Sequence, residues 1–236
     1  MKTEEYYTAA AILISSVRGK ELGAKRPLCF IELDEKPVFV QAVDHLAASK
    51  RFREIILFLH EEWVGLGVNT SNYWHLNIVR SIIAGSEDHF ITIKKGLTVL
   101  KKGYALVGIH DGARPLTPSK LIAEVMDEAF KHGFAIAVRV VTDEDHPDRD
   151  PVFDYDGKQY AVQSPLGIKQ PLLRELIEKS NERCHGLIDL LHLAMENGIE
   201  PRLVIAEEEN PKITISEDLD RCFEIIKKRV RRLRIS

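Results

Sequence analysis

Two polar loops carry the residue types that handle phosphate groups, and each follows an apolar run. The first, residues 15–27, reads SSVRGKELGAKRP and contains two glycines and four cationic side chains. The second, residues 110–115, reads HDGARP and places Asp111 just after the apolar run YALVGI. Backbone N–H groups and cationic side chains bind phosphate oxygens, and a carboxylate can hold the metal ion that accompanies a triphosphate. Both loops are therefore candidates for one phosphate-handling site.

Apolar runs alternate with amphipathic segments along the chain, which is the pattern of strands and helices in βαβ units. Strands are expected at residues 7–15, 53–60, 75–81, 104–109, 134–141 and 202–205. Helices are expected at residues 37–48, 91–100, 117–132, 171–181, 187–197 and 216–232. This alternation predicts an α/β fold built on a mainly parallel sheet. Ligands of such sheets bind beyond the carboxyl ends of the strands, where both polar loops begin.

The composition is that of an ordinary globular protein and favours a single domain over residues 1–236. The chain is 44% hydrophobic and 29% charged, and its net charge of −3 gives no general attraction to nucleic acid or anionic membranes. Three widely spaced cysteines indicate neither a disulfide framework nor a zinc site. No apolar run approaches the ~18 residues of a membrane span and no signal-peptide core is present, so we expect a cytoplasmic protein. The basic stretch at residues 227–234, KKRVRRLR, is interpreted as the solvated end of the last helix.

Four stretches, in order along the chain, resemble the signatures of one enzyme family. HDGARP at residues 110–115 resembles HDAARP, and NPKITISEDL at residues 210–219 resembles NIKITxPEDL. AGSEDHFITIKKGL at residues 84–97 resembles GGxxRxxSVxxGL, and QSPLGI at residues 163–168 resembles QTPQxF. The chain thus resembles the 2-C-methyl-D-erythritol 4-phosphate cytidylyltransferase family, whose relatives include ribitol-5-phosphate cytidylyltransferases. The resemblance covers almost the whole chain.

The resemblance implies a Rossmann-like sheet of the sugar-phosphate nucleotidyltransferase type. It also implies a protruding arm, at about residues 143–163, that makes a homodimer; without the resemblance this polar segment would be interpreted as a solvated loop or hairpin. The implied reaction is transfer of CMP from CTP to a small sugar or polyol phosphate, with release of pyrophosphate and with Mg²⁺ on the phosphates.

Carried over residue by residue, the resemblance makes Asp111 the metal-side carboxylate and Lys212 a ligand of the phosphates. Lys20 is a further catalytic candidate, because another loop conformation could present two of the loop's cations to the phosphates. The nucleotide-binding candidates are Ser15, Ser16, Arg18, Gly19, Gly85 and Thr92. The substrate-side candidates are Asp189 and Ser164. From the residues alone, Asp111 could instead cap a turn or pair with Arg114, and the loop cations could be ordinary solvated charges.

The opening loop departs from the family pattern AAGxGxRM, four residues, PKQ. Aligned without gaps, Glu21 stands at the family's catalytic arginine and Leu28 at its catalytic lysine. A carboxylate about 4 Å from a phosphate costs roughly 4 kcal/mol at an effective dielectric near 20, which is nearly a thousandfold in rate. On the base side, Ser86 and His89 replace a glycine and an arginine of the family pattern, so the choice of base is open.

Two hypotheses remain open at the level of the sequence. One is a divergent cytidylyltransferase, and the other is a catalytically impaired homologue that keeps the fold for ligand binding or for partnering an active enzyme. A dinucleotide-dependent oxidoreductase is disfavoured, because no GxGxxG motif follows the first strand.

Overall fold

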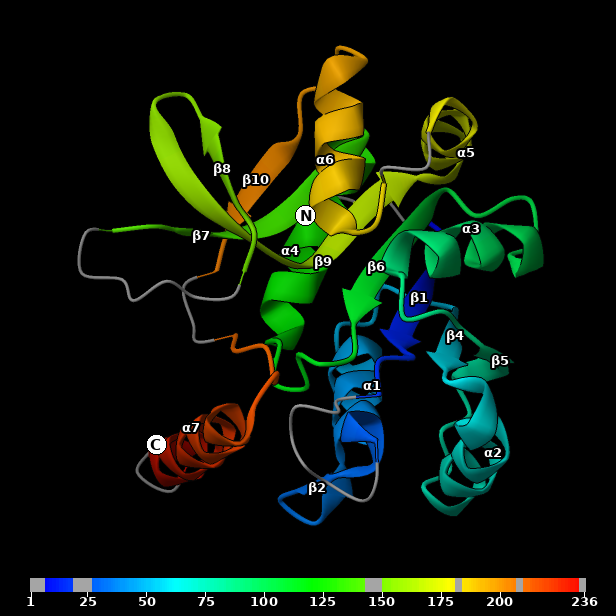
Figure 1. The fold of residues 1–236 in the computed structure, drawn as a ribbon, viewed down its shortest axis with the longest axis vertical. Coiled ribbons are helices and arrows are strands. Elements are labelled where there is room, and N and C mark those ends of the chain that lie inside the picture. Colours follow the sequence, from blue (N-terminus) through cyan, green and yellow to red (C-terminus); the bar gives the residue numbers. More distant parts are fainter. Residues whose placement is uncertain (1–6, 19–26, 143–149, 181–183, 207–209, 234–236) are drawn as a thin grey trace, which may run out of the picture.

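The computed structural model describes residues 7–18, 27–142, 150–180, 184–206 and 210–233 (Figure 1). Its main sheet has the strand order β10-β7-β9-β6-β1-β4-β5, with β8 paired to β9. The strands are β1 Ala9–Ser15, β4 Glu54–Leu59, β5 Val79–Ala84, β6 Leu106–Asp111, β7 Phe134–Val140, β8 Val152–Tyr155, β9 Lys158–Lys169 and β10 Arg202–Ile205. A separate short hairpin joins β2 Glu32–Leu33 to β3 Lys36–Pro37.

The sheet is mainly parallel, as the sequence predicts. Strand β1 runs parallel to both β4 and β6, β4 runs parallel to β5, and β7 runs parallel to β10. Strand β9 is antiparallel to both of its neighbours in the sheet, β6 and β7. Because β1 and β6 are adjacent and parallel, the two loops that follow them leave from the same edge of the sheet.

Helices cover both faces of the sheet, which gives the three-layer arrangement of an α/β fold. Helices α1 Val38–Ala48, α2 Val64–Tyr73 and α4 Ser119–His132 supply one hydrophobic cluster with one face of the strands. Helices α3 His89–Val99, α5 Gln170–Lys179 and α6 Leu187–Glu196 supply the other. Helix α7 Ser216–Leu233 lies apart from both layers in Figure 1. Two short 3-10 helices, Leu28–Phe30 and Glu61–Trp63, complete the described elements.

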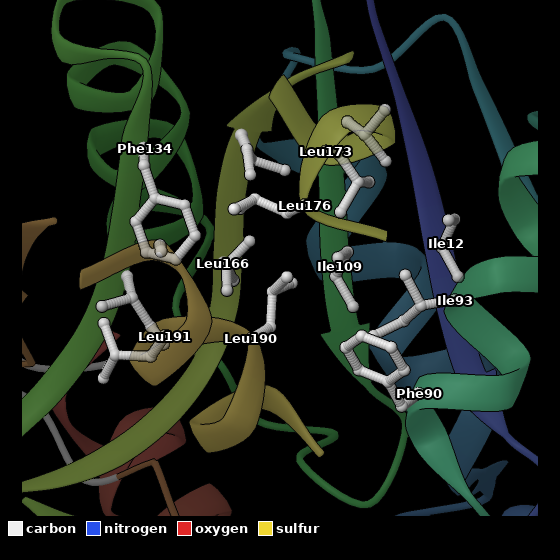
Figure 2. Close-up of a cluster of buried hydrophobic side chains, with 14 of the residues drawn as sticks. Ile12, Phe90, Ile93, Ile109, Phe134, Leu166, Leu173, Leu176, Leu190 and Leu191 are labelled. Atoms are coloured by element: carbon white, nitrogen blue, oxygen red, sulfur yellow. The ribbon is translucent and has the colours of Figure 1, made fainter. Parts of the chain in front are cut away.

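The core explains why the central strands are apolar throughout. All seven residues of β1 are buried, because helices cover both of its faces. Figure 2 shows the layer against α3, α5 and α6, where Phe90 and Ile93 of α3 pack beside Ile12 of β1. In the same layer, Leu190 of α6 lies close to Leu166 of β9. This packing fixes the strands whose carboxyl ends carry the polar loops.

Strand β9 joins the central sheet to an outlying hairpin. Its first residues pair with β8, and the two strands extend away from the body of the sheet (Figure 1). The turn between them uses positive φ at Asp156 and Gly157. The predicted arm, residues 143–163, therefore contains β8 and the start of β9, but residues 143–149 lie outside the described residues and β9 continues to Lys169 in the sheet.

Most predicted elements form within a few residues of their expected bounds. The short strands β2, β3 and β8 were not among the predicted strands, and three longer elements also differ. The strand expected at residues 75–81 forms later, as β5 Val79–Ala84. Helix α2 was not predicted at all, and neither was the strand β9, whose sequence places a proline within a central strand. Among the described residues, no helix is both long enough and apolar enough to span a bilayer.

Candidate functional site

Asp111 ends strand β6 and is buried, with 7% of its side chain exposed. One carboxylate oxygen, Oδ1, accepts the backbone N–H of Ala113 at 2.9 Å, which turns the chain out of the strand. The other, Oδ2, lies 2.8 Å from Nζ of Lys212. The structure thus brings together the two residues that the sequence analysis placed at the centre of the site. Asp111 caps its turn as well, but its cationic partner is Lys212 and not Arg114.

The Asp111 carboxylate is held in its ionised form. Burial alone would raise its pKa, but the nearby positive charges outweigh burial, with Lys212 the largest and His89 and Arg114 contributing. The net effect is a pKa well below the ordinary value of an aspartate. The site therefore presents a permanent carboxylate next to an ammonium group that is one-third exposed.

Lys212 owes its position to the buried side chain of Asn210. The Asn210 amide donates to the carbonyl oxygen of Ser164 at 3.0 Å and to Oε1 of Gln163 at 3.2 Å, and its Oδ1 accepts from Thr117 at 2.7 Å. On the other side of the lysine, the backbone N–H of Ile213 donates to the carbonyl of Ala113 at 2.8 Å. The segment is thereby fastened to β9 and to the loop after β6. The motif predicts the lysine as a site residue, but the asparagine that positions it was not predicted.

Arg114 holds the same segment through a buried side chain. Its side chain is 3% exposed, donates to the carbonyl of Asn210 at 2.5 Å and forms an ion pair with the equally buried Asp150. A buried arginine needs such a carboxylate partner, because desolvation of an unpaired charge is costly. Asp150 was not predicted as part of the site, because its role appears only when its partner is known.

His110 lies beneath Asp111 in the apolar interior of the sheet. One ring nitrogen, Nδ1, is 3.1 Å from the hydroxyl of Ser164, and the other, Nε2, is 3.2 Å from the carbonyl of Arg114. The Ser164 hydroxyl also accepts the backbone N–H of Asp111 at 3.2 Å. Ser164, a substrate-side candidate, therefore lies beside the Asp111–Lys212 pair, but its hydroxyl is bonded to other groups of the protein. Burial lowers the pKa of His110 to about 4.

This low pKa predicts that acid destabilises the fold through His110. The histidine is neutral when folded, but unfolded it titrates near pH 6.5, so its contribution is complete above about pH 6.5 and is lost as the pH falls toward about 4. A shift of this size corresponds to roughly 3 kcal/mol at most. Urea unfolding at pH 7.5 and pH 5 measures it. We expect His110→Asn to reduce the difference in unfolding free energy between the two pH values. An unchanged difference would show that other groups cause the acid sensitivity.

Ser15 ends strand β1 beside the Asp111 loop, and Ser16 follows it. The Ser16 hydroxyl donates to the carbonyl of Ser86, tying β1 to the loop after β5. The Ser15 hydroxyl is buried and has no hydrogen-bond partner. Ser15 lines a small apolar cavity together with Asp111 and Gly112. An unpartnered buried hydroxyl is uncommon in proteins, and here it lies next to the carboxylate of the site.

The loop after β5 packs closely against the end of β1 and against α3. A Cβ atom at Gly85 would lie 2.9 Å from the Ser16 side chain and 3.0 Å from that of Phe58, so glycine is required there by close approach. Thr92 accepts the N–H of Ser86 at 2.9 Å, and its hydroxyl is 3.1 Å from the Ser86 carbonyl. Gly85 and Thr92, both nucleotide-binding candidates, thus shape the loop that faces the site.

Arg18, predicted to bind the nucleotide, is engaged by three side chains at the ends of β4 and β5. Its guanidinium lies 2.9 Å from Nε2 of His60, 3.4 Å from the carboxylate of Glu62 and 3.8 Å from that of Glu87. The arginine is 38% exposed, so these contacts can exchange with solvent or with a ligand. Gly19, Lys20 and Glu21 lie outside the described residues.

Leu28 is 5% exposed and belongs to a third apolar cluster. This cluster joins the 3-10 helix Leu28–Phe30 to helix α7 and to the loop after β6, through residues including Leu33, Ala113, Ile213 and Cys222. The position at which the resemblance expects a lysine is therefore a packing position in this chain.

Asp189, predicted on the substrate side, lies in the first turn of helix α6. Its carboxylate accepts the backbone N–H of His185 at 2.8 Å and that of Gly186 at 2.9 Å. These bonds satisfy N–H groups at the start of the helix, which is the usual role of an acidic residue there. Its neighbours Gly186 and Leu187 reach the pocket, and Asp189 supports them from behind.

An open pocket of about 110 Å³ lies next to the Asp111–Lys212 pair. His89 of α3 and Ser164 of β9 line it together with the pair. No group of three His, Cys, Asp or Glu side chains gathers in the part of the chain that is described, so these residues form no metal cage of their own. A single ionised carboxylate does fit Mg²⁺, which commonly takes one or two carboxylates and completes its coordination with phosphates and water. The arrangement can hold a phosphate chain and its cation.

Comparison with known proteins gives one consistent result. The protein-family model described as 2-C-methyl-D-erythritol 4-phosphate cytidylyltransferase matches residues 9–228. A protein of that description from Syntrophus aciditrophicus is 26% identical over 92% of this chain and 95% of its own length. One from Alkaliphilus metalliredigens is also 26% identical, over 88% of each chain.

Solved structures show the same fold at lower sequence identity. The 4-diphosphocytidyl-2C-methyl-D-erythritol synthase of Anaerococcus prevotii superposes with a TM-score of 0.76 at 20% identity, covering 94% of this chain and 97% of its own. The 2-C-methyl-D-erythritol 4-phosphate cytidylyltransferase of Thermus thermophilus gives a TM-score of 0.65 at 20% identity, covering 92% and 98%.

Proposed function

Because the chain belongs to the 2-C-methyl-D-erythritol 4-phosphate cytidylyltransferase family, we propose that it transfers CMP from CTP to a small sugar or polyol phosphate. The observation that carries the proposal is the ion pair between the buried Asp111, at the carboxyl end of β6, and the partly exposed Lys212, next to an open pocket. A carboxylate and an ammonium 2.8 Å apart are the two groups that a metal-bound triphosphate needs.

In this reaction an oxygen of the acceptor phosphate attacks the α-phosphorus of CTP. The bond between that phosphorus and the oxygen bridging to the β-phosphate breaks, and pyrophosphate leaves. Such transfers need alignment and charge neutralisation more than covalent help. Lys212 would place its positive charge against the phosphates, and Asp111 would hold the cation that they carry. Mg²⁺, when bound, would supply positive charge that offsets the negative charge of the phosphates.

The loop after β1 would form the nucleotide side of the site. Two described residues here can turn to a ligand: Ser15, at the end of β1, has an unpartnered hydroxyl, and Arg18, in the loop, has exposed contacts that can exchange. Ser16, Gly85 and Thr92 would act by holding the Ser86 loop in place, since their groups are engaged within the protein.

Assembly as a homodimer through the β8–β9 hairpin is part of the same proposal. The hairpin extends from the sheet and exposes 45% of Val152. Isologous contact between two such arms would bury this side chain.

A second candidate function, ligand binding without turnover, is favoured by one specific observation. Leu28 packs in the apolar cluster under α7, so the position at which the resemblance places a catalytic lysine offers no charge to the phosphates. A homologue of this kind would keep the Asp111–Lys212 pair for binding and would lack the charge that accelerates transfer.

Pyrophosphate release with CTP, Mg²⁺ and a panel of sugar and polyol phosphates tests the proposal. We expect acceptor-dependent release, together with a rise in Tm on adding CTP and Mg²⁺, because a ligand that binds only the folded state stabilises it. A rise in Tm without release would favour the second candidate. Neither release nor a rise in Tm would contradict both functions.

The paired reversion Glu21→Arg with Leu28→Lys separates the two candidates further, with Leu28→Met as the apolar control of similar volume. Activity gained from an inactive parent would identify a decayed enzyme. Activity lost from an active parent would show that the loop has been rebuilt around Leu28 for its own acceptor.

A further inference from the structure

A second hollow lies at the outer edge of the sheet, between helix α2 and the last strand, β5. It is an open groove of about 390 Å³, larger than the pocket beside Asp111. Its lining comes from the end of α2, the turn that follows and the first residues of β5, while Ser86 and the loop of the candidate active site follow the other end of that strand. None of the residues assigned to CMP transfer lines it.

The polar residues that line the groove are hydrogen-bond donors, and none of them is acidic. The polar residues that line it carry two hydroxyls, two amides, one imidazole and one guanidinium; they are Ser71, Ser81, Asn72, Asn77, His75 and Arg80. No carboxylate is among the lining residues. The apolar part, which includes Leu76 and Ile82, lies against the hydrophobic layer of the sheet. A lining rich in donors and free of carboxylates suits an anion, since each of these six side chains can donate a hydrogen bond.

Ser71 provides an independent sign of a ligand. It is 8% exposed, and its hydroxyl has no hydrogen-bond partner. A helical serine usually bonds to a backbone carbonyl one turn back, so an unpartnered hydroxyl in this position needs an explanation. A ligand oxygen in the groove would supply the missing partner.

The end of helix α2 would repel an anion if its last carbonyls were free, but several are engaged. The carbonyls of Thr70, Ser71 and Asn72 accept the backbone N–H groups of Trp74, Leu76 and His75, respectively, at 2.9–3.2 Å. His75 itself has a positive φ of 51°, which completes this tight turn and places its ring among the lining residues.

We propose that this groove binds the phosphate group of a small phosphorylated metabolite, at a site separate from the Asp111–Lys212 pocket. Arg80 supplies the charge, and Ser71, Asn72 and Asn77 supply neutral donors. The fork of an arginine matches the geometry of a phosphate, which makes Arg80 the residue on which binding depends most.

Titration of the ¹⁵N-labelled full chain with inorganic phosphate, and then with glycerol 3-phosphate, tests the proposal by NMR. We expect saturable shifts of the Ser71, Asn77 and Ser81 amides, with a Kd of about 1 mM or tighter. The amides of Asp111 and Lys212 report any binding at the other pocket separately. Arg80→Gln should weaken binding in the groove about tenfold, the usual effect of losing a charge-assisted bond.

Arg53→Gln is the matched control, because it removes the same charge from an exposed arginine outside the groove. Both arginines act on Tyr104, where each opposes the rise in its pKa caused by burial, so the two lie at the same end of neighbouring strands. If both variants weaken phosphate binding equally, the effect comes from net charge alone and the proposal is overturned. The absence of saturable shifts at the groove amides would also overturn it.

Ser71→Ala supplies a readout that a purely structural role would not give. We expect it to weaken phosphate binding at least threefold while leaving Tm unchanged or higher, because it removes an unsatisfied buried hydroxyl. A lower Tm with unchanged phosphate binding would show that the hydroxyl serves the fold, and would contradict its role as a ligand.

Discussion

Replacing Lys212 by methionine is expected to lower the rate of CMP transfer about a thousandfold, the equivalent of roughly 4 kcal/mol of lost charge stabilisation at about 4 Å from a phosphate. Methionine keeps most of the length and apolar contacts of the lysine and removes its charge. The loss should appear in kcat/KM, measured by pyrophosphate release. If turnover is absent in the parent protein, the same variant should abolish the rise in Tm caused by CTP and Mg²⁺.

Two further variants distinguish the role of Lys212 from a general loss of structure. Lys212→Arg keeps the positive charge beside Asp111 and should retain CTP binding within about tenfold, because the cation matters more than its shape at a point contact. Asp111→Asn removes the carboxylate and should weaken the dependence on Mg²⁺ instead. A Lys212→Met protein that stays within tenfold of the parent would show that the pair is structural and would remove the main support for the proposed site.

Stability should follow a different order from activity in this series. Lys212→Met leaves the Asp111 carboxylate buried without its cation, and breaking a buried pair is commonly worth about 3–5 kcal/mol. Because Lys212 is one-third exposed, water can replace part of that interaction and the loss should be smaller. Asp111→Asn removes the buried charge itself but keeps an oxygen for the Ala113 N–H, so it should be better tolerated.

The sequence predicts the strands and helices whose patterns are strong, and misses those that depend on tertiary contacts. Strands β1, β4, β6 and β7 are apolar runs buried on both sides, and this pattern is visible in any sequence. Helix α2 contains two glycines and little amphipathic pattern. Gly67 lets this helix pack closely against β4, where a Cβ atom would meet the end of the Leu59 side chain.

Strand β9 illustrates the same limit. A proline is rare in a central strand, so QSPLGI did not predict one. The structure accommodates Pro165 where the pairing of β9 with β7 shifts register, between the segment opposite Ile136 and the segment opposite Val138. In this irregular stretch Ser164 contacts His110 and Asp111. The proline segment that kept the strand from being predicted therefore contributes to the site.

At the site, the sequence identifies residues that are specific by type and misses those that act by position. The motifs point to Asp111 and Lys212, and the structure places the two side chains in contact. Asn210, Asp150 and the partners of Arg18 could not be predicted, because each acts through a contact with a residue far along the chain.

Replacing Gly112 by alanine is expected to destabilise the fold by about 1–3 kcal/mol, the usual cost of overpacking a filled position. A Cβ atom at residue 112 would fall well inside contact distance of the Ser15 hydroxyl oxygen, and 3.0 Å from both the Ile14 carbonyl oxygen and the Ser15 Cβ. The strand end and the loop backbone leave little room for it. Urea unfolding of the parent and the variant measures the cost.

Ser15→Ala should relieve much of this cost, because it removes the oxygen that the new methyl group would meet. The resemblance also links positions 15 and 112. The family pattern has alanine at both positions, and this chain has Ser15 and Gly112. The hydroxyl of Ser15 therefore occupies the space of the missing methyl group, next to the Asp111 carboxylate.

A double-mutant cycle gives the coupling between the two positions. Ser15→Ala alone should be neutral or stabilising, since the hydroxyl has no partner. The double variant should be more stable than the sum of the single effects predicts, by about 1 kcal/mol or more, as is usual for residues in direct contact. If the effects of the two single substitutions on stability simply add, the Ser15 hydroxyl does not occupy the space of a methyl group at residue 112. If Ser15→Ala also reduces the rise in Tm caused by CTP, the hydroxyl is retained for the ligand, and Gly112 is glycine because Ser15 needs the space.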